Sequence, residues 1–181
     1  MTVINGYALL AMTPIRDMAR EKYRDHGVSY GLSEAGYDIR VKQRITFTKR
    51  LYPAGEHWET YVDGQWMGEE QFALASTIEF FQMPKNLVGI VHDKSTWARQ
   101  GLSVFNTVLE PGWSGFLTLE LAMKSKRELE IPAGAGIAQV IFHEIAVPSS
   151  YGNGKYQNQE DKPVESRWVS DTPDMIRQEG E

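Results

Sequence analysis

The segment FLTLELAM at 116–123 alternates strictly between two faces, and no other pattern in the chain constrains the fold as much. Successive side chains of a strand point to opposite sides, so the three leucines and the methionine form one apolar face that predicts a core. The opposite face carries Glu120 among a phenylalanine, a threonine and an alanine. A carboxylate on such a half-apolar face is typical of a pocket or a subunit interface; the alternative is an ion pair with a lysine across the sheet.

Polar groups are concentrated in the longer stretch that runs from Lys94 to Ala122, KSTWARQGLSVFNTVLEPGWSGFLTLELA, which is otherwise apolar and strand-like. Polar side chains are costly to bury without partners, so a cluster like this usually serves helix caps, turns or a ligand. The glycines and the proline of the stretch predict turns between strands. Such turns can aim side chains at one pocket.

From Tyr37 onward, short runs of β-type residues alternate with turn sequences such as VDGQ and EPGWSG. The runs predict strands near 37–48, 72–80, 87–91, 101–108, 115–123 and 136–145. Many short strands with one early helix predict a mainly-β protein, either a sandwich or a barrel of jelly-roll type.

Three segments differ from this β pattern. TPIRDMAREKYRDH at 13–26 predicts the short N-terminal helix, with Thr13 as N-cap, a proline at the first helical position and Gly27 as the stop. Residues 49–71 are polar and aromatic without a clear period, which predicts an excursion or hairpin on the surface. Residues 149–181 are polar with few aliphatics, which predicts a tail that is mobile or ordered by a ligand.

Length and composition predict a single domain over residues 1–181, with 41% hydrophobic and 24% charged residues. A net charge of −5 argues against a nucleic-acid duplex or an anionic membrane as the main partner. The absence of cysteine excludes disulfides and thiolate metal sites. The start, MTVINGYALLAM, lacks the features of a secretory signal, and no run reaches the length of a transmembrane helix. We therefore expect a cytoplasmic protein.

Four blocks of the sequence resemble the dCTP deaminases of the trimeric dUTPase superfamily. The blocks are SYGLSEAGYDIRV at 29–41, KSTWARQGL at 94–102, NTVLEPGWSGFLTLELA at 106–122 and GKYQNQ at 154–159. Their shared order and spacing make the resemblance specific. It implies a distorted jelly-roll-like β-barrel of the dUTPase type and the hydrolysis of dCTP to dUTP and ammonia.

The resemblance assigns the chemistry to Glu120 and Arg99. Glu120 matches the glutamate of the family's TLE motif, which acts as general base and then as general acid. Deamination needs a water deprotonated for attack on C4, a proton delivered to N3, and ammonia expelled. One carboxylate can do this when its pKa lies near the working pH. Arg99 matches the arginine that helps to hold the catalytic water, and as a neighbouring cation it would tune the pKa of Glu120. The alternative role for Arg99 is a structural salt bridge.

Further positions match the family's nucleotide-binding residues. Lys94, Ser95 and Thr96 correspond to a phosphate-contacting set that can reach the site of a neighbouring subunit. Val108 would read the cytosine edge through its backbone, and Glu110 would lie near the deoxyribose and base. Trp113 would be a packing residue of its turn, with a contact to the base as the alternative. Tyr151, Lys155 and Gln159 belong to a tail that closes over the triphosphate. The resemblance also implies Mg²⁺ bound through the triphosphate, no zinc, and a homotrimer with sites between subunits.

The sequence departs from the family pattern at two places. Glu34 and Ala35 alter the loop of the first block, and Asp93 stands where the family has a glycine, which places a negative charge near the proposed phosphate site. The tail has GKYQNQ where classical trimeric dUTPases carry a Gly-rich phosphate-wrapping motif, and this favours a deaminase.

Zinc-dependent cytidine deaminases are excluded by the sequence. His57 and Glu59 supply an H-x-E pattern, but those enzymes also need a P-C-x-x-C motif, and the chain has no cysteine. Two alternatives stay open. One is a dUTP pyrophosphatase or a bifunctional, dUMP-forming enzyme in which Glu110 activates a second water. The other is a nucleotide-binding regulator without catalysis.

Overall fold

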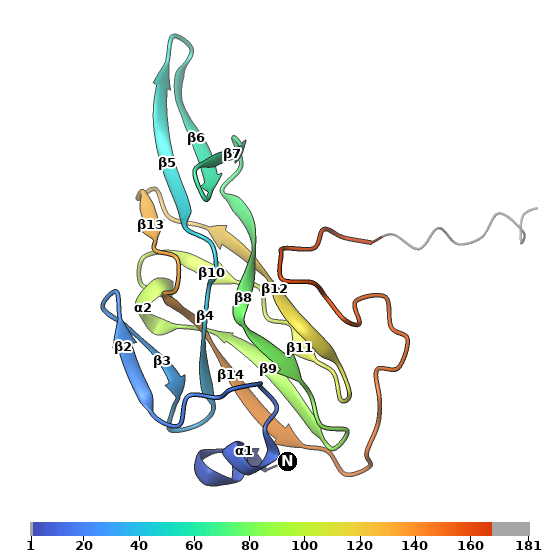
Figure 1. Ribbon diagram of the computed structural model, residues 1–181. Helices are drawn as coiled ribbons and strands as arrows, with labels where there is room; N and C mark the ends of the chain where they lie inside the picture. Colours follow the sequence, from blue (N-terminus) through green and yellow to red (C-terminus); the bar gives the residue numbers. More distant parts are fainter. Residues whose placement is uncertain (1, 168–181) are drawn as a thin grey trace, which may run out of the picture.

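The computed structural model describes residues 2–167, which form three antiparallel sheets and two short helices (Figure 1). The largest sheet places its strands in the order β11 (Val108–Leu109), β9 (Leu87–Asp93), β14 (Gly136–Glu144), β4 (Tyr37–Arg40), β3 (Val28–Leu32) and β2 (Lys22–Asp25), with β1 (Val3–Ile4) paired to β14. The second sheet has the order β10 (Leu102–Val104), β12 (Ser114–Met123) and β8 (Phe72–Gln82). The third has the order β13 (Leu129–Ile131), β5 (Ile45–Tyr52), β6 (Gly55–Val62) and β7 (Gln65–Gly68).

The mainly-β fold class predicted from the sequence is confirmed. The strands of residues 2–167 form three separate sheets and do not close into one barrel. The long predicted strand at 37–48 is divided into β4 and β5, and the one at 101–108 into β10 and β11. No helix of the described chain is long and apolar enough to cross a membrane.

The alternation of β12 has the predicted consequence for the core. Its four apolar positions, from Leu117 to Met123, are all at most 6% exposed. The opposite face of the same strand includes Glu120, which is half-buried. The alternating pattern therefore places this carboxylate on the side of β12 that faces away from the core.

The predicted helix over residues 13–26 is wrong. The first helix, α1 (Gly6–Met12), ends at Thr13, which is left-handed with a φ of 45° and donates its N–H to the carbonyl of Leu9. Thr13 is thus a C-cap, and the proline after it follows a helix end. Residues 22–32 form the β2–β3 hairpin, whose two-residue turn at His26 and Gly27 has positive φ at both positions. Such a turn matches the twist of the strands, and the cross-strand pairing outweighs the helical spacing of the side chains.

The predicted hairpin over residues 49–71 is confirmed, and it projects from the body of the molecule at the top of Figure 1. Strands β5 and β6 pair along their whole length, and β7 folds back onto β6 through a turn at Asp63 and Gly64. Both turn residues have positive φ, as the Asp-Gly pair of a two-residue hairpin loop requires. This arm carries aromatic and basic side chains, and its base meets the end of β12, where the N–H of Met123 bonds to the carbonyl of Gln71 at 2.9 Å.

The described part of the tail, residues 149–167, contains no helix or strand and follows β12 (Figure 1). Strand β10 pairs only with the last residues of β12, so the edge near Ser114 and Phe116 is free to bond the tail. There the N–H of Asn158 bonds to the carbonyl of Ser114 at 2.8 Å, and the N–H of Phe116 to the carbonyl of Gln159 at 3.1 Å. A Cβ at Gly115 would lie 2.6 Å from the nitrogen of Gln159, so this approach requires glycine. The rest of the predicted mobile tail, residues 168–181, lies outside the described residues.

Candidate functional site

A cavity of about 520 Å³ lies between β12 and the tail. It is lined by residues of β8, β11, β12 and the tail, among them Thr118, Glu120, Val108, Trp113, Tyr151 and Gln159. This volume lies within the range of sites for small organic ligands. Five of the residues predicted from the sequence are therefore brought to one cavity by a single chain: Glu120, Val108, Trp113, Tyr151 and Gln159.

Glu120 is a carboxylate without a partner in this cavity. Its neighbour across the sheet on β8 is Leu74, and its side chain forms no ion pair or hydrogen bond with another residue within 2–167. Burial raises the pKa of Glu120 above the ordinary glutamate value of 4.5, with a smaller opposing effect of its own backbone. The alternative of a strand glutamate paired with a lysine is thus not what the structure shows. An unpaired carboxyl group with a raised pKa is suited to proton transfer.

Thr118, two residues before Glu120 on the same face, joins the strand to the tail. Its hydroxyl donates to Oε1 of Gln159 at 2.9 Å and accepts the N–H of Val164 at 3.0 Å, while its backbone N–H reaches the same Oε1 at 3.2 Å. Thr118 and Gln159 are both buried. The amide of Gln159 is therefore engaged as an anchor of the tail, close to the carboxylate.

Trp113 and Tyr151 form a second connection between the turn and the tail. The indole N–H of Trp113 donates to the carbonyl of Tyr156 at 2.7 Å, and the ring packs against Phe81 with centroids 6.0 Å apart. This agrees with the predicted packing role of Trp113. The hydroxyl of Tyr151 accepts the N–H of Tyr156 at 3.3 Å. Together these contacts hold the tail over one wall of the cavity.

The segment that begins at Lys94 lies elsewhere. Ser95 and Thr96 open the one-turn helix α2 (Ser95–Ala98), Arg99 follows its last residue, and all three are exposed and outside the cavity lining. Within one chain the structure does not bring Arg99 to Glu120, contrary to the expected pair. Trp97 of the same turn is buried and donates its indole N–H to the carbonyl of Gly136 at 2.7 Å, which fixes the turn to the largest sheet.

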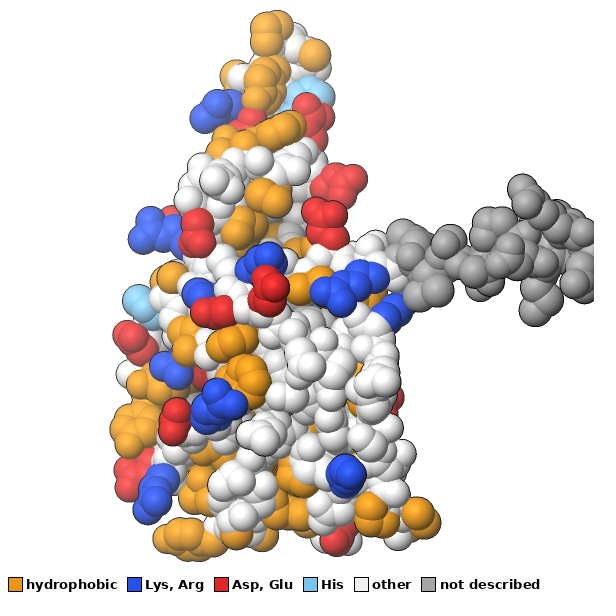
Figure 2. Space-filling model, turned by 45° about the vertical axis from the view of Figure 1, so that its right-hand side comes forward, with side chains coloured by type: hydrophobic (Ala, Val, Ile, Leu, Met, Phe, Trp, Pro, Cys, Tyr) orange, Lys and Arg blue, Asp and Glu red, His pale blue; other side chains and the backbone are white. Residues whose placement is uncertain are grey.

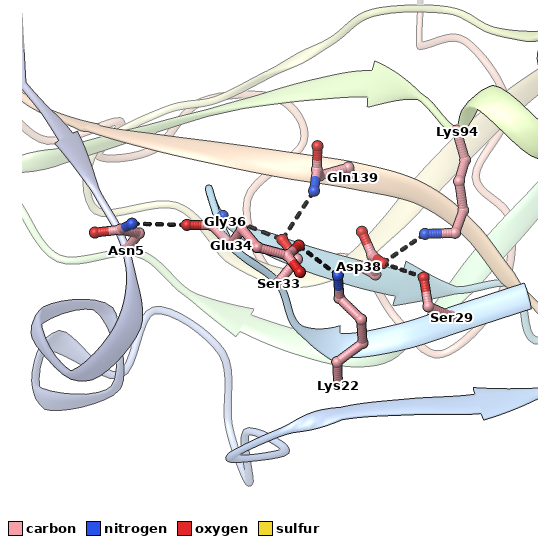
Figure 3. A network of polar contacts seen from close by, with 9 residues as sticks. All are labelled: Asn5, Lys22, Ser29, Ser33, Glu34, Gly36, Asp38, Lys94 and Gln139. Carbon is pink, nitrogen blue, oxygen red and sulfur yellow. Dashed lines mark hydrogen bonds and ion pairs between the residues drawn. The ribbon is translucent and has the colours of Figure 1, made fainter.

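Lys94 points into the protein. Its ammonium group forms an ion pair with Asp38, and the two side chains are 11% and 3% exposed (Figure 3). Asp38 also accepts the hydroxyl of Ser29 at 2.8 Å through the same Oδ2, while its Oδ1 is buried with no partner within 2–167. In this arrangement the amine of Lys94 anchors the turn before α2.

Two acidic residues that depart from the family pattern, Asp93 and Glu34, form contacts with neighbouring groups of the same chain. Oδ1 of Asp93 accepts the N–H of Val104 at 2.7 Å, so its charge is engaged at the end of β10. Glu34 pairs with Lys22, and its carbonyl accepts the amide of Asn5 at 2.7 Å (Figure 3). These acidic side chains serve local contacts at the positions where they replace other residues.

The last two predicted binding residues lie at the margin of the cavity. Glu110 is exposed on the turn after β11, where its carbonyl accepts the N–H of Trp113 at 3.1 Å. Lys155 is exposed in the tail beside Tyr156. Sequence reasoning missed several lining residues, namely Phe72, Leu74, Val164, Glu165 and Ser166. Alternation along β12 already placed Thr118 on the face of Glu120, whereas the PVES segment of the tail carried no signal of its own.

Comparison with known proteins agrees with this picture. Residues 10–145 match the model of a dCTP deaminase-like family. The dCTP deaminase of Roseiflexus castenholzii is 39% identical and the match covers 80% of this chain and 86% of the relative. That of Protochlamydia amoebophila is 38% identical over 73% of this chain and 77% of the relative.

The fold is also found in a solved structure, the 2′-deoxycytidine 5′-triphosphate deaminase from Agrobacterium tumefaciens. The two share 14% identity with a TM-score of 0.51, and the match covers 80% of this chain and 48% of the other. At this identity the similarity concerns the fold. The family model spans most of the chain and the curated relatives share more than a third of the aligned residues, so the chain belongs to the dCTP deaminase-like family.

Proposed function

We propose that the protein hydrolyses dCTP to dUTP and ammonia. The observation that carries this proposal is Glu120, an unpaired and half-buried carboxylate in a cavity of about 520 Å³. It occupies the TLE position of a chain that is 39% identical to a dCTP deaminase.

In the proposed reaction, Glu120 moves protons at three points. Its carboxylate takes a proton from a water molecule, whose oxygen then adds to C4 of the cytosine ring. The protonated carboxyl group delivers that proton to N3. A second proton from the added hydroxyl passes to the 4-amino group, the C4–N bond breaks, and ammonia leaves as the C4 carbonyl forms. Burial raises the pKa of Glu120, and a raised pKa makes its carboxylate a stronger base for the first of these transfers.

We further propose a homotrimer in which the α2 turn of one subunit completes the cavity of the next. Ser95, Thr96 and Arg99 are exposed and face solvent in the single chain, although the family resemblance gives them phosphate and water contacts. Val108 and Phe105, near the cavity, are 51% and 47% exposed and offer apolar surface for such an interface. Closed symmetric assembly would bring the two halves of the site together.

Magnesium would enter with the substrate. The carboxylates that line the cavity are Glu120 and Glu165, and residues 2–167 contain no group of three His, Asp or Glu that could hold a metal. Mg²⁺ favours phosphate oxygens and water over such a sparse protein set, which fits an ion carried by the triphosphate. When bound, it would neutralise part of the triphosphate charge, and the proton transfers would belong to Glu120.

The test is incubation of the purified protein with dCTP and Mg²⁺, with ammonia, dUTP, dUMP and pyrophosphate separated in one chromatographic run. Ammonia with dUTP supports the proposal, and dUMP with pyrophosphate would establish a bifunctional enzyme instead. Glu120→Gln should still bind dCTP and release no ammonia. Glu130→Gln, an exposed glutamate on β13, is the control and should turn over normally. Binding of dCTP by the wild type without any product would make the protein a regulator.

A further inference from the structure

Glu120 lies between apolar side chains of the two neighbouring strands. On β8 it pairs with Leu74, and directly opposite residues of an antiparallel pair have Cβ atoms about 5 Å apart. On the other side of β12, the N–H of Phe105, the residue after β10, bonds to the carbonyl of Glu120 at 3.0 Å. The ring of Phe105 also reaches that of Phe72 on β8, with centroids 6.2 Å apart, so this contact crosses β12. We call Phe72, Leu74 and Phe105 the apolar cluster.

Two members of the apolar cluster belong to the same cavity wall as the carboxylate. Phe72 and Leu74 line the cavity together with Glu120, and all three are half-buried. Leu74 is the one that lies directly opposite Glu120. It therefore contributes apolar surface at a place where a water molecule could otherwise hydrogen-bond to the carboxylate.

The groups that face Glu120 from the other elements do not compensate its charge. The cavity lining within residues 2–167 contains no Lys or Arg, and its other charged residue is Glu165 of the tail. The hydroxyl groups of Tyr151 and Tyr156 each accept a backbone N–H of the tail. Burial is accordingly the largest cause of the raised pKa of Glu120, and its own backbone opposes it.

Carboxylates on the surface of the molecule have a different environment. Figure 2 shows several places where Asp or Glu side chains lie beside Lys or Arg side chains, all open to solvent. A charged carboxylate is stabilised by water, by hydrogen-bond donors or by a cation, and apolar side chains supply none of these. An apolar neighbour therefore favours the protonated form and makes the carboxylate bind a proton more tightly.

We propose that Leu74 is a positioning residue, which keeps bulk water from the carboxylate of Glu120 and so makes this group a stronger base. The inference rests on the proposed function, because it explains how the general base of that reaction is tuned. A polar side chain at position 74 would hydrate the carboxylate or donate a hydrogen bond to it, and would stabilise its charged form. The rate of proton abstraction from water would then fall with the strength of the base.

The test compares Leu74→Asn, which places a polar side chain of similar size opposite Glu120, with Ile78→Asn. Ile78 lies on the same strand, is 37% exposed and is not among the residues that line the cavity. NMR of isotope-labelled glutamate carboxyl groups follows the titration of each full-length protein, and Glu120→Gln identifies the resonance of Glu120.

For Leu74→Asn we expect the pKa of Glu120 to move down towards the ordinary value of 4.5. The kcat for dCTP should fall about 10-fold, with KM changed less than about twofold, because the substrate still binds and the base is weaker. Ile78→Asn should leave the titration and both kinetic parameters unchanged. Leu74→Met, which stays apolar, should behave like the wild type.

Other outcomes overturn the proposal. Thermal unfolding shows whether Leu74→Asn is folded, and Leu74→Thr is a second polar variant that suits a strand. An unchanged titration of Glu120 in the folded variant, or an equal change in Ile78→Asn, would mean that Leu74 does not shield the carboxylate. A raised KM with kcat unchanged would make Leu74 only a wall for the substrate. The titration requires no turnover, so a protein that titrates as expected but releases no ammonia would retain the shielded carboxylate and lose the deaminase.

Discussion

The two halves of the predicted site differ in how far one chain completes them. The half around Glu120 is enclosed by β12, its neighbours and the tail, and its polar contacts are formed within the chain. The half around α2 has Lys94 buried against Asp38, while Ser95, Thr96 and Arg99 remain exposed and do not line the cavity.

This difference has a physical meaning for the site. The half around Glu120 has an unpaired carboxylate that is suited to proton transfer, but no Lys or Arg is among the residues that line its cavity. The half around α2 offers hydroxyl groups and a guanidinium, which can donate hydrogen bonds to water or to phosphate oxygens. Each half offers what the other lacks, as expected for a site between two subunits of a symmetric assembly.

The largest expected effect tests whether the two halves come from different subunits. Glu120→Gln and Arg99→Ala should each lose activity about 1000-fold, since removal of a proton-transfer group or of its partner costs that much. When the two variants are mixed and allowed to exchange subunits, about a quarter of the sites in random trimers would combine an intact Glu120 with an intact Arg99. The measurement is ammonia release before and after mixing.

Arg127→Ala, at an exposed arginine two residues before β13, serves as the control and should be fully active. No recovery after proven subunit exchange would show that both residues act within one chain. A monomer by light scattering, with activity intact, would refute the shared site altogether.

The next effect concerns the anchor of the α2 half. Asp38→Asn leaves the ammonium of Lys94 buried without its counter-charge, and we expect a loss of about 3 kcal/mol in the free energy of unfolding. Urea denaturation measures it. Asp161→Asn, which breaks the exposed pair with Lys42, should cost less than about 1 kcal/mol. If Asp38→Asn behaves like this control, the buried pair does not hold the turn, and Lys94 is free to act as a phosphate ligand.

A smaller effect is expected at the junction of strand and tail. Thr118→Val removes the donor to Gln159 and the acceptor for the N–H of Val164, a loss of about 1–2 kcal/mol that loosens the tail. We expect the KM for dCTP to rise about 5- to 10-fold with little change in kcat. Thr46→Val on the projecting arm is the matched control and should alter neither parameter. A fall in kcat at unchanged KM would place Thr118 in the chemistry and not in the closure of the tail.

The smallest expected effect is on the pH dependence. The carboxylate of Glu120 is protonated as the pH falls, so kcat/KM should decrease on the acidic side of its pH profile. The apparent pKa of this decrease should lie above the ordinary glutamate value of 4.5, because burial raises the pKa of Glu120. The raised pKa also means that the folded protein binds this proton more tightly than the unfolded chain. The associated stabilisation is fully present below the unfolded pKa and is lost as the pH rises through the folded one.

Glu120→Gln should therefore be more stable than the wild type at neutral pH, and this advantage should disappear in acid. Thermal denaturation of both proteins between pH 4 and pH 8 is the measurement, with the range chosen to span the ordinary glutamate pKa of 4.5. An acidic limb at or below 4.5 would contradict the role given to burial.

Local patterns in the sequence were sufficient for much of the fold. Alternation over 116–123 predicts both the core face of β12 and the position of Glu120, since side chains of a strand alternate by geometry alone. The polar segment with its Asp63–Gly64 turn predicts the projecting hairpin, because that pair readily adopts the positive φ that the turn needs. The same reasoning failed over residues 13–26, where helical spacing was real but pairing between β2 and β3 prevailed.

The tertiary structure decided which of the predicted site residues meet. Lys94 turns inward because Asp38, 56 positions away in the sequence, supplies a buried counter-charge. Gln159 becomes an anchor because Thr118 lies on a strand edge that β10 leaves free. Thus the strands, their core faces and the candidate carboxylate follow from local patterns, because they depend on neighbours along the chain. The enclosure of Glu120 and the separation of Arg99 from it depend on contacts between distant segments, and these exist only once the sheets have packed.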